Sequence, residues 1–297
     1  MFDYHLKTSK KRKQKVFNKI LSKDIQNNDV VNIHCTGPKN VGDYYCGPHL
    51  YFDRLRGKKH SIFGFRSMKK SVTRRFEKQV VEKQLIIGGG GLLNIKTFKW
   101  QMQLFQKLAE KGKKVVVWGA GHNEINLDDY KQNKTYWNDL SKFGLVGTRD
   151  FSMPFEWVPC VSCLHPVFDK TYDEQHEVGL LFNTKSFKDK TFIDKFSHYP
   201  FSSNTTNLEE MIGFIGASRT LVTNSYHAMY WGILMGKRVV AIPATSKFLD
   251  FKYKVPIATF DDFEDHLKKT QVYNGVLEEC REINLKFADK VFDYLDL

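Results

Sequence analysis

Residues 223–240, TNSYHAMYWGILMGKRVV, read as a polar turn, an apolar helix, a glycine stop and the start of a strand. Asn224 or Ser225 can cap the N-terminus of this helix, and Gly236 suits its end. His227 then lies in the first turn, where free backbone N–H groups and the helix dipole favour a bound anion. An imidazole there can transfer protons near neutral pH, or it can simply be a well-accommodated histidine at a helix start.

The same order of strand, loop and helix recurs along the whole chain, which predicts an α/β fold with parallel sheets covered by helices. The candidate strands are too many for one open sheet, and the polar residues 169–177 interrupt the rhythm. We therefore expect two Rossmann-like domains, 1–170 and 171–297, that face each other across a cleft. Ligands of such sheets bind beyond the C-terminal ends of the strands, so the cleft should collect the loops of both domains.

The expected strands cover residues 30–35, 61–65, 84–87, 114–118, 145–148, 155–159, 177–182, 198–202, 220–223, 238–242 and 256–259. The expected helices cover residues 41–55, 97–111, 208–217, 226–235, 260–269 and 275–294. Residues 115–117 and 239–242 are nearly all apolar, which is typical of strands that are buried on both faces.

The chain has 297 residues with 41% hydrophobic content and a net charge of +13, concentrated in residues 7–19 and 69–75. Such clusters can attract nucleic acid, an anionic membrane or anionic substrates, or can form a solvated face. Aromatic residues do not interleave with them, so we expect no nucleic acid partner. No run of residues is apolar enough to span a membrane, and residues 1–20 are rich in lysine and lack the apolar core of a secretory signal, so we expect a cytoplasmic protein.

Five cysteines in a chain of this length do not form a disulfide framework. Cys160 and Cys163 make one CxxC pair, and a zinc site would need Cys46, His165 or another distant ligand. We expect buried reduced thiols and no metal.

Several expected strands end in loops that suit a ligand-binding cleft. After the first strand, Gly37 and Gly42 permit close backbone approach, and Asn40 and Asp43 could hold a sugar hydroxyl or accept a proton. Asp43 could equally be only a helix cap. After residues 145–148, Arg149 could contact a phosphate or carboxylate through two N–H groups, or pair with its neighbour Asp150.

Glycine runs follow two other strands of the first half. Gly88, Gly89, Gly90 and Gly91 remove every Cβ there, so a ligand or the opposite chain can touch the backbone. Gly119 and Gly121 follow the next strand. Neither run matches a P-loop or a dinucleotide-binding fingerprint.

Taken together, these pieces resemble the polysaccharide pyruvyl transferase family. The resemblance rests on an ordered set of motifs between residues 37 and 243: NVGD at 40–43, GGGGLL at 88–93, GAG at 119–121, RDFS at 149–152 and TNSYHA at 223–228. It implies a GT-B-like fold, in which the last helix packs back onto the first domain. It also implies transfer of the pyruvyl unit of phosphoenolpyruvate, the donor substrate, to two sugar hydroxyls as a cyclic ketal, with no cofactor.

Carried over by position, Arg149 resembles the donor-binding arginine of the family, and His227 resembles its histidine. In this interpretation His227 is the acid, Asp43 is the base, and Asn224 and Ser225 belong to the donor site. Many members carry arginine where this chain has Ser225. Lys39, Arg66, Lys185 or Arg219 could supply the missing charge.

The resemblance further implies a glycan or lipid-linked saccharide acceptor at the inner face of the membrane, where residues 7–19 could add electrostatic attraction. The alternative for those residues is a frayed, solvated tail. Two other functions stay open on the sequence: a GT-B-type glycosyltransferase with a nucleotide-sugar donor, and a non-catalytic protein that binds anions or glycans.

Overall fold

The computed structural model describes the backbone of residues 2–36 and 40–297, and side chains from residue 10 onward within those ranges. Gly37 and Lys39, named above as a loop glycine and a candidate cation, lie outside the described residues.

The first domain is built on a sheet of parallel strands in the order β2-β1-β3-β4-β5-β6. Apolar side chains fill its centre, and those of Leu85, Ile86 and Val115 are fully buried. The strands are β1 (Val30–His34), β2 (Lys59–Ser61), β3 (Gln84–Leu93), β4 (Val115–His122), β5 (Leu145–Thr148) and β6 (Glu156–Trp157).

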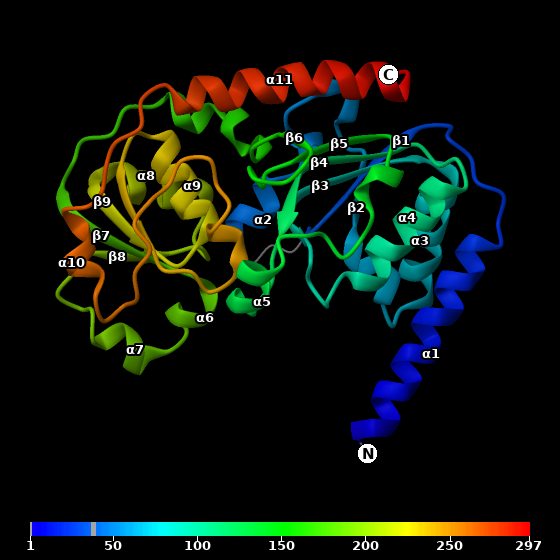
Figure 1. The fold of residues 1–297 in the computed structure, drawn as a ribbon, viewed down its shortest axis with the longest axis horizontal. Helices are drawn as coiled ribbons and strands as arrows, with labels where there is room; N and C mark the ends of the chain where they lie inside the picture. Colours follow the sequence, from blue (N-terminus) through cyan, green and yellow to red (C-terminus); the bar gives the residue numbers. More distant parts are fainter. Residues whose placement is uncertain (1, 37–39) are drawn as a thin grey trace.

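Helices cover both faces of this sheet (Figure 1). On one face, α1 (Phe2–Leu21), α3 (Lys70–Glu82) and α4 (Lys99–Glu110) bury one apolar cluster that includes Ile20 and Phe76. On the other face, α11 (Val276–Leu295) packs Phe287 and Phe292 against Trp118 of β4.

The second domain has parallel strands in the order β10-β9-β7-β8, with bounds β7 (His176–Phe182), β8 (Phe201–Ser203), β9 (Ser218–Thr223) and β10 (Arg238–Ala241). One face is covered by α8 (Leu208–Ala217) and α9 (Tyr226–Leu234), and Figure 1 shows both beside this sheet. An aromatic cluster that includes Phe182, Phe196 and Phe263 fills the other face. The short helices are α2 (Val41–Tyr45), α5 (Leu127–Gln132), α6 (Thr184–Phe187), α7 (Lys190–Asp194) and α10 (Phe263–Leu267).

Single 3₁₀ turns complete the connections: η1 (Pro48–Leu50), η2 (Asp53–Leu55), η3 (Ile62–Arg66), η4 (Leu140–Lys142), η5 (Val161–Leu164), η6 (Pro166–Asp169) and η7 (Ser246–Phe248).

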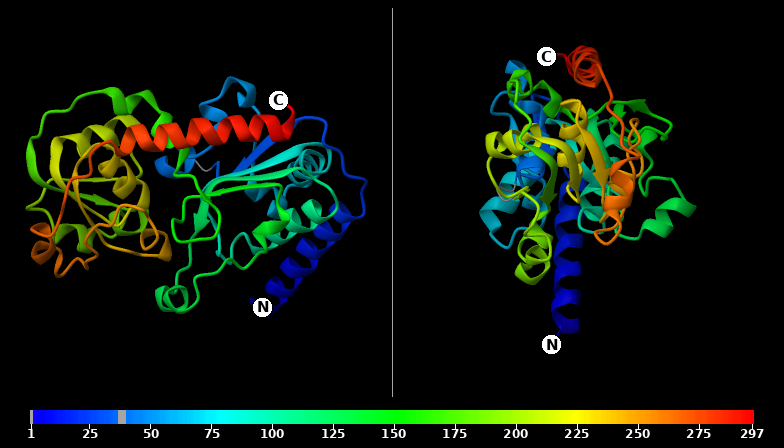
Figure 2. Two further views of the ribbon diagram at one scale, coloured as in Figure 1. Left: turned by 45° about the horizontal axis from the view of Figure 1, so that its top comes forward. Right: turned by 90° about the vertical axis from the view of Figure 1, so that its left-hand side faces the viewer.

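The expected α/β fold of two Rossmann-like domains is confirmed, and its arrangement is GT-B-like. The last strand of the first sheet ends at Trp157 and the first strand of the second begins at His176. Helix α11 then runs from the second domain back over the first (Figures 1 and 2). Lys114, just before β4, fixes the C-terminal end of α11 by donating a hydrogen bond of 2.8 Å to the carbonyl oxygen of Tyr294.

Several expected elements are wrong in their limits. Both glycine runs lie inside strands, because Gly88 pairs with Trp118 and Gly90 with Ala120 in the β3–β4 ladder. Residues 61–65 are mostly the turn η3, since the Ser61 hydroxyl caps the N–H of Phe63. The helix expected at 41–55 ends at Tyr45, just before Gly47 and Pro48, and Pro48 begins a separate turn.

The basic N-terminal segment forms the helix α1 along its length from Phe2 to Leu21. Its apolar stripe anchors it, with Phe17 edge-on to Trp100 of α4 at 5.7 Å between ring centres. Within the described residues, no helix is both long and apolar enough to cross a bilayer.

Candidate functional site

A cavity of about 460 Å³ lies between the two domains, lined by residues of both. Its walls come from the C-terminal ends of the strands: Cys35 follows β1, Asn123 follows β4 and Arg149 follows β5. From the second domain, Asn183 follows β7, Asn204 follows β8, Asn224 follows β9 and Thr245 follows β10. Strand ends of two parallel sheets therefore converge on one site, as the rule for open α/β sheets requires.

Arg149 is the deepest cation of the cavity, with 1% of its surface exposed. Its guanidinium carbon lies 4.0 Å from the centre of the Tyr226 ring. Among the described residues, neither Nε nor Nη2 of Arg149 has a hydrogen-bond partner. A buried guanidinium with unused donors is costly to the fold, and a bound phosphate or carboxylate would offset that cost.

Gly121 explains how β4 makes room for this side chain. A Cβ at Gly121 would lie 2.6 Å from Nε of Arg149 and 2.5 Å from Oδ1 of Asp150. Gly119 is similarly packed against the carbonyl oxygen of Pro159, at 3.2 Å from such a Cβ. Both glycines were expected in a loop that suits a ligand-binding cleft, but neither lines the cavity. They pack against Arg149 and Pro159 instead.

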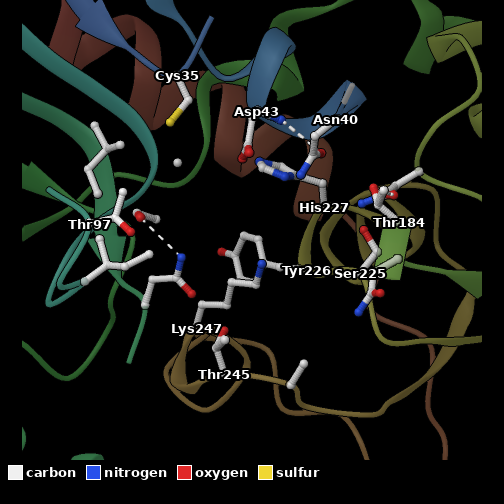
Figure 3. Close-up of a pocket in the computed structure, with 18 of the residues that line it drawn as sticks. Cys35, Asn40, Asp43, Thr97, Thr184, Ser225, Tyr226, His227, Thr245 and Lys247 are labelled. Carbon is white, nitrogen blue, oxygen red and sulfur yellow. Dashed lines mark hydrogen bonds between the residues drawn. The ribbon is translucent and has the colours of Figure 1, made fainter. Parts of the chain in front are cut away.

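Lys247 is a second cation that sequence reasoning missed. It lies in η7 after β10 and lines the cavity (Figure 3). Burial lowers the pKa of Lys247 to about 8, although the neighbouring Asp43 acts in the opposite direction. The signal that could have found it is its position just after the strand at 238–242, where the rule for strand ends applies.

The other cations proposed from the sequence divide into two groups. Arg66 and Lys185 line the cavity. Arg219 does not, because it stands at the opposite end of β9, exposed and paired with Glu177 at 3.2 Å.

Asp43 lines the cavity from the first turn of α2, and Asn40 is the cap of that helix. The side chain of Asn40 accepts a hydrogen bond of 3.4 Å from the backbone N–H of Asp43. The alternative in which Asp43 is only a cap is therefore wrong, and its carboxyl group is free for the cavity.

His227 reaches the cavity from the first turn of α9 and packs against Gly42, where a Cβ would lie 2.0 Å from Nδ1. Its Nε2 lies 3.7 Å from Sγ of Cys160. Figure 3 shows the His227 ring next to Asp43, with Tyr226 and Lys247 below them. Gly42 thus leaves room for the imidazole because it has no side chain, and it does not itself line the cavity.

Burial moves the pKa values of these two groups in opposite directions. It raises the pKa of Asp43, against the charges of Lys247 and Arg149. It lowers the pKa of His227 well below its usual value, and the charges of Arg149 and Lys247 lower it further. The neutral form is thus favoured for each. A shift toward the neutral imidazole suits a base and a shift toward the protonated carboxyl suits an acid, the opposite of the two roles expected from the sequence.

Asn224 and Ser225 both line the cavity. Oδ1 of Asn224 accepts a hydrogen bond of 2.6 Å from the N–H of Asn183, and its Nδ2 donates to the Ser186 hydroxyl at 2.8 Å. Asn224 therefore orders the loop after β7. Ser225 is the N-cap residue of α9 but makes no side-chain cap bond, so its hydroxyl is available to a ligand.

The glycine run of β3 meets the cavity through Gly89, Gly90 and Gly91, whereas Gly88 does not line it. Gly90 has φ +89°, a left-handed conformation that favours glycine. A Cβ at Gly90 would lie 3.8 Å from Oδ1 of Asp43, so this backbone runs directly beside the carboxyl group.

The CxxC cysteines are buried free thiols. Cys160 approaches the Ser162 hydroxyl at 3.2 Å, and Cys163 approaches Nδ2 of Asn284 at 3.5 Å. Within the described part of the chain, no three side chains of the metal-binding types cluster together.

No protein-family model and no curated protein matches the sequence. Among solved structures, the chain is similar to an α-glucosyltransferase in complex with UDP and a 13-mer DNA. The identity is 11%, the match covers 91% of this chain and 95% of that chain, and the TM-score is 0.42. It is also similar to a protein assigned as a UDP-N-acetylglucosamine 2-epimerase from Listeria monocytogenes, at 10% identity over 92% of this chain and 89% of that one, with a TM-score of 0.42. Both likenesses are distant and concern the fold alone.

Proposed function

We propose that this protein is a transferase that moves the pyruvyl unit of phosphoenolpyruvate onto two hydroxyl groups of a sugar, as a cyclic ketal. One observation carries the proposal: a single cavity holds two cations together with Asp43 and His227, and burial shifts the pKa values of these two groups toward their neutral forms. Arg149 has unused guanidinium donors, and Lys247 shares the cavity. These cations and the N-terminus of α9 suit a donor that carries both phosphate and carboxylate.

The charge of the cavity favours a compact donor over a nucleotide sugar. A ribose diol is commonly held by a carboxylate in Rossmann-like domains. Among the described residues that line the cavity, Asp43 is the only carboxylate, and it comes from the first domain. The second domain contributes amides, hydroxyls, Lys185 and Lys247, which are ligands for an anion.

In the proposed reaction, protonated Asp43 gives its proton to the methylene carbon of the donor, and the central carbon becomes electrophilic. One sugar hydroxyl adds to that carbon and gives its proton to neutral His227. The bond from carbon to the phosphate oxygen then breaks, phosphate leaves with the electron pair, and the second hydroxyl adds. One of the two hydroxyl protons is returned to Asp43, whose own proton is now in the methyl group of the product. The other hydroxyl proton leaves with phosphate.

Ligand-induced thermal stabilisation separates this proposal from the glycosyltransferase alternative, because a ligand of the folded state raises the melting temperature. We expect phosphoenolpyruvate to stabilise the protein more than UDP- or GDP-sugars at the same concentration. Selective stabilisation by UDP or GDP would replace the proposal with a GT-B-type glycosyltransferase. Stabilisation by phosphoenolpyruvate, with no phosphate release on any sugar acceptor, would favour a non-catalytic anion-binding protein.

We also propose that the acceptor is a glycan or lipid-linked saccharide at an anionic membrane surface. The two basic clusters of the sequence support this, because they meet in a groove of about 540 Å³ between α1 and α3. Arg12, Lys15 and Lys19 line it from α1, and Lys70 and Arg74 line it from α3. Charges gathered in this way attract an anionic lipid surface more strongly than either cluster alone.

A further inference from the structure

A second hollow of about 340 Å³ lies next to the main cavity on the first domain. Ile95, Thr97 and Asn123 line both, so the two adjoin. A third hollow of about 240 Å³ shares Glu124 and Trp137 with the second. The three hollows follow one another and form a groove that leads away from the donor cations. We name the second and third hollows the side groove.

Trp137 is a fixed aromatic surface in the side groove. Its side chain is 42% exposed, which is unusual for so large an apolar ring. The indole Nε1–H donates to Oε1 of Glu124 at 3.2 Å, and the backbone N–H donates to Oδ1 of Asn94 at 2.8 Å. The indole bond holds the ring and the backbone bond holds the segment that carries it, so a ligand that stacks on the ring loses little entropy to side-chain ordering.

The polar groups of the side groove differ from those of the main cavity. Glu124 and Asp129 line it, with the amides of Asn126 and Asn133 close by, and Lys96 is the one cation among its described lining residues. Carboxylates accept hydrogen bonds from hydroxyl groups, and amides both accept and donate them. The negative charge of the carboxylates disfavours a phosphate or a polyanion. An exposed aromatic ring beside convergent hydroxyl-binding groups suits an uncharged saccharide.

We propose that the side groove binds neutral sugar units of the acceptor, adjacent to the unit that reacts in the main cavity. That these sugar units belong to the acceptor rests on the proposed function, whereas saccharide binding at Trp137 does not. Asn123 marks the junction: its Nδ2 donates to the carbonyl oxygen of Gly91 at 3.3 Å and links the groove to the glycine run of the main cavity. A chain of several sugar units can thus extend from the transfer site across Trp137.

Calorimetric titration with maltotriose, cellotriose and N,N′-diacetylchitobiose tests the proposal on the full chain without donor. We expect at least one of these saccharides to bind, Trp137→Ala to weaken that binding about tenfold or more, and Trp137→Phe to stay within about threefold of the unsubstituted protein. Leu285→Ala, which truncates an exposed apolar residue of α11, is the matched control and should bind normally. Binding by none of the three saccharides, or equal binding by Trp137→Ala, would overturn the proposal.

A parallel thermal-shift titration with phosphoenolpyruvate separates this inference from the proposed function. We expect Trp137→Ala to keep the full shift, because Trp137 does not line the donor cavity. If phosphoenolpyruvate fails to stabilise any variant while Trp137→Ala still loses saccharide binding, the donor assignment fails and the saccharide groove stands. If the shift persists and saccharide binding is unaffected, the groove assignment alone fails.

Discussion

The guanidinium of Arg149 lies 4.0 Å from the centre of the Tyr226 ring, so a cation of the first domain stacks on an aromatic residue of the second across the cleft. The contact joins the two domains at the main cavity. It also orients a planar group whose unused N–H donors can make a two-point contact with phosphate or carboxylate.

Arg149→Lys should therefore weaken the binding of inorganic phosphate and phosphoenolpyruvate about tenfold or more. An ammonium group reproduces neither the stacking geometry nor the planar pair of donors. Isothermal titration with phosphoenolpyruvate measures the change. Arg219→Lys, at an exposed ion pair on the far end of β9, is the control and should bind normally. Unchanged affinity in Arg149→Lys would remove this residue from the donor site.

Asp43→Asn should reduce turnover by about 10² to 10⁴ without loss of thermal stability. The substitution removes the transferable proton but not the helix cap, because Asn40 makes the cap bond. Conversely, Asn40→Ala should cost about 1 kcal/mol of unfolding free energy. Turnover should also decline as the pH rises through the elevated pKa of Asp43, since the acid form is then lost. A variant Asp43→Asn with full turnover would contradict the assigned acid.

Gly42→Ala should displace the His227 imidazole and reduce turnover at least about tenfold, because the new Cβ would lie 2.0 Å from Nδ1. Gly213→Ala is the matched control: this glycine lies in α8 with no neighbour within 4 Å of a Cβ, so alanine should be neutral or slightly stabilising. Steady-state kinetics of both variants measures the effect. If Gly42→Ala is as active as Gly213→Ala, the position of His227 is unimportant for turnover.

The contribution of Asp150 to stability should fall as the pH rises from about 4 to about 7. Asp150 belongs to a buried network between the domains. Nδ1 of His122 lies 2.8 Å from the Ser246 hydroxyl, and Asp150 accepts hydrogen bonds from the backbone N–H of His122 and from the Tyr136 hydroxyl. Burial raises the pKa of Asp150 to about 7. At Asp150 the folded state then binds more protons than the unfolded state between these pH values, so the contribution of Asp150 to stability decreases with rising pH, by up to about 4 kcal/mol. Burial lowers the pKa of His122 to about 3, so the contribution of His122 rises over the same range.

The variant Asp150→Asn isolates this effect because it keeps the shape and cannot ionise. Between pH 4 and pH 8, the melting temperature of the variant should rise relative to that of the unsubstituted protein as the pH rises, because only the unsubstituted protein loses the contribution of Asp150. Parallel curves for the two proteins would mean that Asp150 does not titrate in this range.

The basic groove between α1 and α3 should bind anionic vesicles. Replacing Lys15 and Arg74 together by glutamine should remove about 2 kcal/mol of binding free energy to vesicles of phosphatidylserine and phosphatidylcholine. Lys268→Gln with Lys269→Gln, two exposed cations of the second domain, is the control of equal charge. Co-sedimentation measures both. Equal pelleting of all three proteins would exclude a membrane role for the groove.

Local sequence patterns were sufficient to predict the bounds of elements whose hydrophobic residues follow one clear periodicity. Helix α8 has the expected bounds, Leu208–Ala217, and β5 has the expected bounds, Leu145–Thr148. Both are apolar runs flanked by polar or glycine residues, so propensity and burial agree. The helices α1 and α3 were not expected, because lysine and arginine obscure a narrow apolar stripe that becomes decisive only when it packs on the sheet.

The sequence by itself determined the alternation of strands and helices. It therefore also determined that Asp43, Arg149 and His227 lie shortly after the C-terminal ends of strands. Only the tertiary structure decided their chemistry. Lys247 joins Arg149 because β10 and β5 end at the same cleft. The protonation preferences of Asp43 and His227 follow from burial and from the cations around them, which depend on residues far apart in the chain. Periodicity is a local property, whereas desolvation and Coulomb interactions act through space.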